Sequence, residues 1–232
     1  MACSSHRMQM ATWSEAMARE DDQLSLFEPH RREESPSKDE SEVQFTQRFI
    51  DSKEADYLFG SLRELNGWRQ DFIRIFGKAQ PLPRLHRWFA GSEQPYRWSG
   101  IEMNPEPFPD YLREILARLW DRTGIQFNTA LGNLYRDSKD SVAWHSDDEP
   151  DLGPNPIIAS LSLGATRRFL LRRKDNHKEV KVYELTHGSL LLMTGSTQAY
   201  WEHTIPKTRH RVGPRINLTF RAICSRPRCL DS

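Results

Sequence analysis

The stretch Arg215-Ile216-Asn217-Leu218-Thr219-Phe220-Arg221 alternates polar and apolar side chains along its whole length. Successive side chains of a β-strand point to opposite faces, so this period predicts a strand with three apolar residues on one face. The other face carries Asn217 and Thr219 between Arg215 and Arg221. We therefore expect a strand inside a sandwich, with its apolar face on the core and its polar face on a site.

The two arginines of this strand predict an anionic ligand. A buried guanidinium is costly unless an anion pairs with it, and no run of acidic residues lies nearby in the sequence. A dicarboxylate would satisfy both groups, because guanidinium and carboxylate form two parallel, charge-assisted hydrogen bonds. Six extended residues span roughly 20 Å, so both arginines reach one small diacid only through long side chains and a twisted strand. The alternative is an edge strand with solvated arginines.

Short runs rich in β-branched and aromatic residues precede this strand, with Gly, Pro, Asn and Asp between them. Such a series without intervening helices is typical of a β-sandwich or a jelly roll. Two helices are expected earlier in the chain, at 54–65 and 109–122, from apolar residues at helical spacing. The predicted strands are 127–135, 157–163, 168–172, 180–184, 189–193, 200–203 and 215–223.

Composition indicates one intracellular domain with a tail. The chain has 232 residues, 37% of them hydrophobic, and no apolar run reaches the roughly 18 residues of a membrane span. Its three cysteines are odd in number and lack metal-finger spacing, which favours a reducing compartment. We expect a monomer without a membrane partner, in the cytoplasm, or in the nucleus if the source is eukaryotic.

The first 45 residues differ in charge from the rest of the chain. They hold five basic and ten acidic residues, for a net charge of −5, whereas the remaining residues carry +6. Residues 30–42 are almost entirely charged residues, serine and proline, so we expect residues 1–45 to be disordered. A mildly basic body is compatible with a nucleic-acid partner but does not require one.

A short metal-binding pattern lies at His145-Ser146-Asp147. In an extended segment, residues two apart share a face, so the imidazole and the carboxylate converge. His203, in the predicted strand 200–203, is the preferred third ligand. Two histidines and one carboxylate form the facial triad of non-haem Fe(II) oxygenases, which leaves positions open for a co-substrate and O₂. By residue type, the second histidine could also be one of four others: His86, His177, His187 and His210.

Two further considerations bear on this pattern. A zinc hydrolase could use the same three ligands with a bound water, and surface loops often hold an isolated His-x-Asp. Asn133 and Tyr135 are also two residues apart, and they supply neutral donors suited to a carboxylate or keto oxygen.

At these residues the sequence resembles the AlkB family of alkylated nucleic-acid repair dioxygenases. The resemblance covers about residues 65–223 and is greatest to the member that prefers single-stranded DNA or RNA. No metal or co-substrate position departs from the family pattern. The matching pieces are Asn133-Leu-Tyr135, His145-Ser-Asp-Asp-Glu-Pro150, Ile158-Ala-Ser-Leu-Ser-Leu-Gly-Ala165, His187-Gly-Ser-Leu-Leu191, His203 and Pro214-Arg-Ile-Asn-Leu-Thr-Phe-Arg221.

The resemblance implies Fe(II), 2-oxoglutarate and O₂ as cofactor and co-substrates. His145, Asp147 and His203 would be metal ligands and catalytic residues. Arg215 would bind the distal carboxylate of 2-oxoglutarate and Arg221 the carboxylate nearest the metal. The remaining predicted pocket residues are Asn133, Tyr135, Asn217 and Thr219. The implied reaction oxidatively demethylates bases of the 1-methyladenine and 3-methylcytosine type in single-stranded, or double-stranded, DNA or RNA, with release of formaldehyde and succinate.

The implied fold is α+β and mainly β, with a double-stranded β-helix (jelly-roll) core, supporting helices and a nucleotide-recognition lid. The lid and helices would occupy 46–124 and the catalytic core 125–223, followed by a tail at 224–232. A base must leave its stack, or start single-stranded, to reach a buried iron. The predicted substrate residues are Trp68, Arg84, Tyr96, Trp98 and Asp148; core packing is the alternative for the two tryptophans.

Two surface features carry weaker expectations. Gln23-Leu24-Ser25-Leu26-Phe27 resembles the pentapeptide with which bacterial replication and repair proteins hold the sliding clamp, or it is an apolar patch that docks on the body. The basic clusters at 167–174 and 207–211 could follow phosphates or could be solvated hairpin faces. The alternative functions are a 2-oxoglutarate hydroxylase of a protein or small molecule and a catalytically silent nucleic-acid-binding module.

Overall fold

The computed structural model describes residues 41–75, 78–91, 96–98, 101–103 and 105–223, all of which belong to one compact unit. Residues 1–40 of the predicted tail 1–45, including the pentapeptide 23–27, and the whole predicted tail 224–232 lie outside the described residues. No helix in the described ranges is long and apolar enough to span a membrane.

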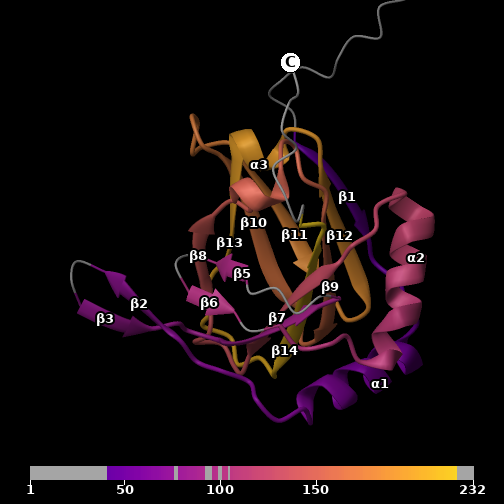
Figure 1. Cartoon of the computed structure of the whole chain (residues 1–232). Coiled ribbons are helices and arrows are strands. Elements are labelled where there is room, and N and C mark those ends of the chain that lie inside the picture. Colours follow the sequence, from indigo (N-terminus) through magenta and orange to yellow (C-terminus); the bar gives the residue numbers. More distant parts are fainter. Residues whose placement is uncertain (1–40, 76–77, 92–95, 99–100, 104, 224–232) are drawn as a thin grey trace, which may run out of the picture. The chain divides into compact units, whose positions relative to one another are not determined.

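Two antiparallel sheets form the core of the molecule (Figure 1). The larger sheet has the order β1-β12-β9-β14-β7-β4 and the smaller sheet the order β11-β10-β13-β8. The larger sheet comprises β1 (Glu42–Thr46), β4 (Leu85–Ala90), β7 (Thr129–Tyr135), β9 (Ile158–Gly164), β12 (Ser189–Thr194) and β14 (Arg215–Arg221). The smaller sheet comprises β8 (Val142–His145), β10 (Arg167–Arg173), β11 (Val180–Leu185) and β13 (Trp201–Ile205).

The winding of the chain confirms the predicted jelly roll. From β7 to β14 the chain passes back and forth between the two sheets, and only β10 and β11 follow one another within a sheet. Outside these sheets lie two hairpins, β2 (Phe72–Ile75) with β3 (Lys78–Pro81) and β5 (Tyr96–Trp98) with β6 (Ile101–Met103).

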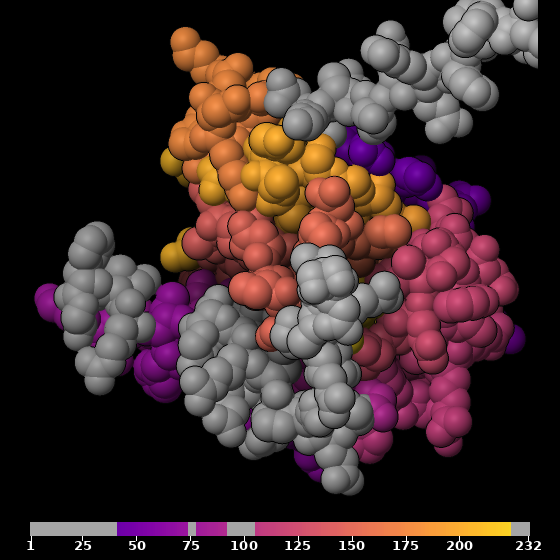
Figure 2. Space-filling view, turned by 45° about the horizontal axis from the view of Figure 1, so that its top comes forward, coloured from indigo at the N-terminus to yellow at the C-terminus, as the bar shows by residue number. Residues whose placement is uncertain are grey.

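Helices cover the outer face of the larger sheet. They are α1 (Ser52–Arg63) and α2 (Arg113–Thr123), which follows the 3-10 turn η1 (Asp110–Leu112). Figure 1 shows α1 and α2 on the same side of the strands, and Figure 2 shows the α2 region (pink) as a continuous layer beside the later strands. The main apolar core lies between this helical layer and the sheet, and it includes Ile216, Leu218 and Phe220 of β14.

Strand β14 is buried at every position, because the helices cover one face and the smaller sheet covers the other. This is the predicted alternation of apolar and polar faces. The polar face, with Arg215 and Arg221, points into the space between the sheets, and both arginines are almost fully buried at 1% and 2% exposure.

Several elements differ from the sequence-based prediction. Residues of β1 (Glu42–Thr46) pair with β12, so the ordered body begins before residue 46. The predicted helix 109–122 begins with the 3-10 turn η1 and becomes α-helical at Arg113, and strand β8 was not among the predicted strands. Strand β4 belongs to the larger sheet, where it pairs with β7, and so part of the predicted lid region is core structure.

Candidate metal and co-substrate site

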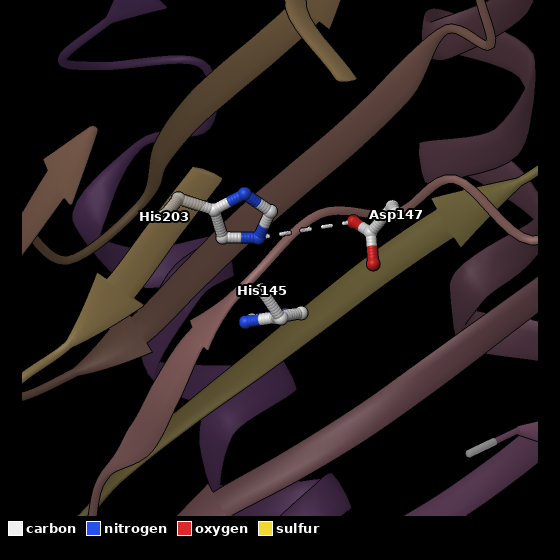
Figure 3. A group of neighbouring side chains, drawn as sticks. All are labelled: His145, Asp147 and His203. Atoms are coloured by element: carbon white, nitrogen blue, oxygen red, sulfur yellow. Dashed lines mark ion pairs between the residues drawn. The ribbon is translucent and has the colours of Figure 1, made fainter. Parts of the chain in front are cut away.

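Three side chains converge at the mouth of the space between the sheets (Figure 3). His145 ends β8, Asp147 follows two residues later, and His203 lies in β13 directly opposite His145 in the strand register. One ligand atom from each residue lies within 4.8 Å of the others, and His203 Nε2 lies 4.0 Å from Asp147 Oδ2. The fold therefore brings the predicted triad together.

The protonation states of this cluster suit a metal. Burial alone would raise the pKa of Asp147, but the nearby Arg221 and the two imidazoles lower it to about 2. Burial and the neighbouring His145 lower the pKa of His203 to about 3. At neutral pH the site thus offers one carboxylate and two neutral imidazoles, which are the forms that bind a metal ion.

A backbone contact orients one of the imidazoles. His145 Nδ1 lies 2.9 Å from the carbonyl oxygen of Ala143. A carbonyl can only accept, so Nδ1 carries the hydrogen and Nε2 keeps its lone pair for a metal. Two nitrogens and one carboxylate oxygen on one side of a metal ion leave the remaining positions open, which fits Fe(II) of the facial-triad type.

Arg215 lies deeper in the same cavity, at the start of β14. Its Nη2 donates to Ser162 Oγ at 2.8 Å, and its guanidinium carbon lies 5.2 Å from the centre of the Tyr135 ring. Its Nε and Nη1 reach no hydrogen-bond acceptor among the described residues. Burial lowers the pKa of Arg215 to about 10, so the group stays charged at neutral pH. Two buried donors on a cation fit a carboxylate ligand.

Arg221 lies at the other end of β14 and pairs with the metal-binding carboxylate. Its Nη2 donates to Asp147 Oδ1 at 2.6 Å. One end of β14 thus faces the triad and the other end faces the deeper part of the cavity, with roughly 20 Å of extended strand between them. A small diacid is much shorter than this, so it could contact both arginines only through their long side chains.

The other predicted pocket residues also line this cavity. Asn133 Oδ1 accepts from Arg84 Nε at 2.7 Å. Asn217 Nδ2 donates to Ser160 Oγ at 2.8 Å, and Thr219 Oγ1 donates to Asn217 Oδ1 at 3.1 Å. These hydrogen bonds hold the polar side chains against the cavity wall and leave the cavity itself free for a ligand.

Several site residues were missed from the sequence. Ser160 and Ser162 lie on the inner face of β9, and their alternation with Leu161 and Leu163 was a usable signal. The ring of Phe169 stacks on the ring of His203, with 5.1 Å between their centroids. No pattern in the local sequence predicts this contact. Glu149 lies just beyond the triad with a raised pKa, caused first by burial, and its Oε2 is buried without a hydrogen-bond partner among the described residues.

The five predicted substrate residues differ in where the structure places them: two lie at the site, two have side chains outside the described residues, and Trp68 lies in the core. Arg84 lines the cavity, and Asp148 is exposed beside Asp147, 3.3 Å from Lys174 Nζ. The side chains of Tyr96 and Trp98 lie outside the described residues, although their backbones form β5.

The prediction for Trp68 requires correction. Its indole Nε1 donates to the carbonyl of Leu62 at 3.1 Å, and its ring packs against Gly132 on the helix-facing side of β7. Gly132 and Asn133 are consecutive in a strand and so face opposite sides. Trp68 therefore contributes to the core and does not face the cavity that contains Asn133.

Comparison with known proteins gives concordant matches. The model of the 2OG-Fe(II) oxygenase superfamily matches residues 42–221. The human protein named alpha-ketoglutarate-dependent dioxygenase alkB homolog 3 is 46% identical over 189 residues, which are 78% of this chain and 65% of that protein. The mouse DNA oxidative demethylase ALKBH2 is 35% identical over 178 residues, covering 74% of this chain and 71% of that protein.

This chain thus spans somewhat less than two thirds of the length of the human homolog 3. Among solved structures, that of OsALKBH1 superposes with a TM-score of 0.58 at 17% identity, covering 78% of this chain and 97% of that one. At this level of identity the likeness concerns the fold, and it agrees with the jelly-roll winding of β7 to β14.

Proposed function

Since the chain belongs to the AlkB family of 2OG-Fe(II) oxygenases, we propose that it is an iron(II)- and 2-oxoglutarate-dependent dioxygenase that demethylates nucleic-acid bases. One observation carries this proposal. A His-Asp-His cluster opens onto the same cavity as the buried Arg215, whose Nε and Nη1 have no acceptor among the described residues. This pairing of a metal triad with a cationic pocket suits a keto diacid beside the metal.

In the proposed reaction, the residues of the site bind the metal and the co-substrate and hold them in position. His145, Asp147 and His203 hold Fe(II) by one face, and Arg221 keeps the carboxylate of Asp147 ionised and in place. Arg215 binds the distal carboxylate of 2-oxoglutarate, supported by Ser162. When bound, iron and 2-oxoglutarate would supply an oxidation in which 2-oxoglutarate is converted to succinate and CO₂, one oxygen atom of O₂ entering succinate and the other entering an N-hydroxymethyl group on the base, which is then lost as formaldehyde.

For the substrate we propose a base methylated in the manner of 1-methyladenine or 3-methylcytosine. Asp148 is exposed at the mouth of the site, where its carboxylate can meet a cationic methylated ring or an exocyclic amine. We place Tyr96 and Trp98 at the faces of the base and Arg84 at the cavity wall. The name of the mouse relative, DNA oxidative demethylase ALKBH2, supports nucleic acid as the substrate.

We further propose that a monomer acts on single-stranded DNA or RNA, in the cytoplasm or, in a eukaryote, in the nucleus. The 46% identity to human alkB homolog 3, against 35% to the mouse ALKBH2, supports an activity like that of the former. A base in a single strand needs no unpairing before it enters a buried site, which lowers the cost of binding.

Formaldehyde release tests the proposal. The full chain with Fe(II), 2-oxoglutarate and O₂ should release formaldehyde from a 3-methylcytosine oligonucleotide, and a single strand should react faster than a duplex. His145→Ala should reduce release to the level without metal, because it removes one of the three ligands. His177→Ala, at a histidine in the turn between β10 and β11 whose side chain is 59% exposed, serves as the matched control and should retain activity.

The same assay separates the alternatives. If 2-oxoglutarate turnover occurs but methylated oligonucleotides never stimulate it, the chain is a hydroxylase of a protein or small molecule. If the chain binds oligonucleotide but turns over no 2-oxoglutarate, it is a silent binding module. Formaldehyde release that survives His145→Ala would exclude the proposed metal site.

A second proposal concerns the pentapeptide 23–27, which we propose binds a sliding clamp through Leu24, Leu26 and Phe27. Its support is the sequence pattern of three apolar anchors in an acidic, polar tail. A peptide covering residues 21–29 should bind purified clamp in a polarisation assay, and the Leu26→Ala, Phe27→Ala double change should abolish binding. Ser25→Ala is the control, and an unmodified peptide without affinity would end the proposal.

A further inference from the structure

The metal-binding aspartate lies beyond the end of its strand. Strand β8 ends at His145, and residues 146–149 have no regular secondary structure. The backbone N–H of Asp147 therefore has no neighbouring strand to accept its hydrogen bond. Because this residue is 1% exposed, water cannot easily replace such a partner. The local sequence by itself leaves the direction of the carboxylate undetermined.

A side chain from another segment accepts the hydrogen bond of the Asp147 N–H that a neighbouring strand would otherwise accept. Gln198 lies in the short helix α3 (Thr197–Tyr200), and its Oε1 accepts from the Asp147 N–H at 2.8 Å. Its Nε2 donates to Met193 Sδ at 3.4 Å, which fixes which end of the amide faces Asp147. Gln198 is 2% exposed, so packing restricts its rotamer.

Two further contacts join the same two segments. Lys174 Nζ donates to the backbone carbonyl of Gln198 at 2.9 Å and to Asp148 Oδ2 at 3.3 Å. Ser146 Oγ donates to the carbonyl of Trp201 at 2.9 Å. The residues on either side of Asp147 are thus attached to the α3 segment and to Lys174, with Gln198 at the centre of this arrangement.

We propose that Gln198 is a positioning residue for the metal, acting through Asp147. The backbone bond to Gln198 fixes the main chain of Asp147, while Arg221 holds Oδ1 of its carboxylate, so that Oδ2 points toward His203. Without Gln198, the carboxylate remains paired with Arg221 but its backbone can rotate, and Oδ2 leaves the metal position. This inference rests on the proposed function only in taking the triad as the metal site.

A merely structural role for Gln198 makes a different prediction. Removal of a buried hydrogen bond would then lower stability and leave the metal affinity of the folded protein unchanged. A positioning role instead lowers metal affinity in protein that is fully folded. Loss of a group that orients a metal ligand typically weakens metal binding by about 10- to 100-fold.

Two variants of Gln198 separate these effects. Gln198→Met keeps the shape of the side chain but removes the acceptor, whereas Gln198→Glu keeps an oxygen acceptor and places a charge in a buried site. Ala199→Gln, at an exposed position of the same helix, is the matched control. Each full-length variant is titrated with Mn²⁺, without oxygen or substrate, and its unfolding is followed by circular dichroism without metal.

The expected result is a Mn²⁺ dissociation constant raised about 10- to 100-fold in Gln198→Met, in protein that is somewhat less stable than the control but that circular dichroism shows to be fully folded at the titration temperature. Gln198→Glu should show the reverse, with lower stability but a dissociation constant within a few-fold of wild type. Equal Mn²⁺ affinity of Gln198→Met and wild type would overturn the inference and leave the metal site intact. Absence of Mn²⁺ binding by the wild-type chain would instead overturn the proposed function and this inference together.

Discussion

At the scale of single residues, the site depends on burying charge next to its partner. Arg221 is buried against the carboxylate of Asp147, whereas the neighbours of Arg215 are the hydroxyl of Ser162 and the ring of Tyr135, neither of which is a carboxylate. Arg215 therefore gains most from an anionic ligand. The two arginines of one strand therefore have different roles, although their sequence positions look equivalent.

Arg215→Lys tests this difference. A lysine keeps the charge but loses the planar fork that matches a carboxylate. Hydrogen bonds to charged groups contribute about 1.5–3 kcal/mol, so we expect the dissociation constant for 2-oxoglutarate to rise about 10- to 100-fold. Calorimetric titration with 2-oxoglutarate in the presence of Mn²⁺ measures it. Mn²⁺ affinity itself should stay unchanged, and unchanged 2-oxoglutarate affinity would place the diacid elsewhere.

A second residue-scale prediction concerns His86, which is 1% exposed beside Asp71, with Nε2 and Oδ2 2.9 Å apart. Burial lowers the pKa of His86, and the charges of Arg84 and Arg69 act in the same direction, while Asp71 opposes them. The unfolded chain binds a proton near pH 6.5 but folded His86 does not. Acidification through that pH therefore favours the unfolded state.

We expect the free energy of unfolding in urea to fall between pH of about 7.5 and about 5.5. The fall should be smaller in His86→Gln, which cannot take up the proton. His177→Gln, at an exposed histidine, should keep the wild-type slope. A slope that is identical in all three proteins would contradict the assigned direction of the pKa shift.

At the scale of elements, a strand of the site could be predicted from the sequence where polar and apolar side chains alternate along it. The period of two placed β14 correctly, and the composition of 157–163 placed β9; their inner faces supply Arg215, Ser160 and Ser162. Strand β8 and strand β1 were not predicted, because β8 is only four residues long and β1 gains its partners from β12. Short strands owe their stability to the neighbour that pairs with them, which local sequence does not contain.

The turn that ends β9 gives a prediction at this scale. Gly164 has a φ of +87°, and a Cβ there would lie 2.5 Å from the carbonyl oxygen of Pro214 and 2.7 Å from the ring of Phe59. Gly164→Ala should cost more than the ~1–3 kcal/mol of a left-handed backbone alone, because the clash is added. Since Gly164 pairs with Arg215 in the sheet, binding of 2-oxoglutarate should weaken too.

Gly124→Ala is the control for this change. Gly124 also has a positive φ, of +67°, but a Cβ there meets nothing within 4 Å. It should lose stability only through its backbone conformation and should bind 2-oxoglutarate normally. Urea unfolding and calorimetry measure the two effects, and equal loss of stability in both variants would show that the close approach at Gly164 is unimportant.

At the scale of the whole molecule, the two sheets meet at a charged cavity. Three arginines and the triad line it, and Asp147 is the only carboxylate of the described part of the chain that does so. Enclosed positive charge opposes folding, so metal and diacid should stabilise the protein as a pair. A ligand present at 100 times its dissociation constant adds about 2.7 kcal/mol.

This predicts a rise in Tm of roughly 5–10 °C for each of Mn²⁺ and 2-oxoglutarate when both are present at about 100 times their dissociation constants, since about 1 kcal/mol shifts a domain of this size by 2–4 °C. Differential scanning fluorimetry measures it, and EDTA should reverse it. Arg215→Lys should keep the part of the rise that Mn²⁺ produces alone and lose the part that 2-oxoglutarate adds. An equal rise in both proteins would contradict a diacid bound at Arg215.

The sequence by itself determined the strand character of 215–221, the shared faces of its polar residues, and the triad members His145 and Asp147. These follow from periodicity, which is a property of neighbouring residues. The sequence favoured His203 as the third ligand but left four other histidines open, and the tertiary structure decided between them by placing His203 opposite His145. The tertiary structure also shows that Trp68 packs in the core and that Gln198 hydrogen-bonds to the backbone of Asp147. Contacts between distant segments depend on how two sheets pack, and packing has no local period.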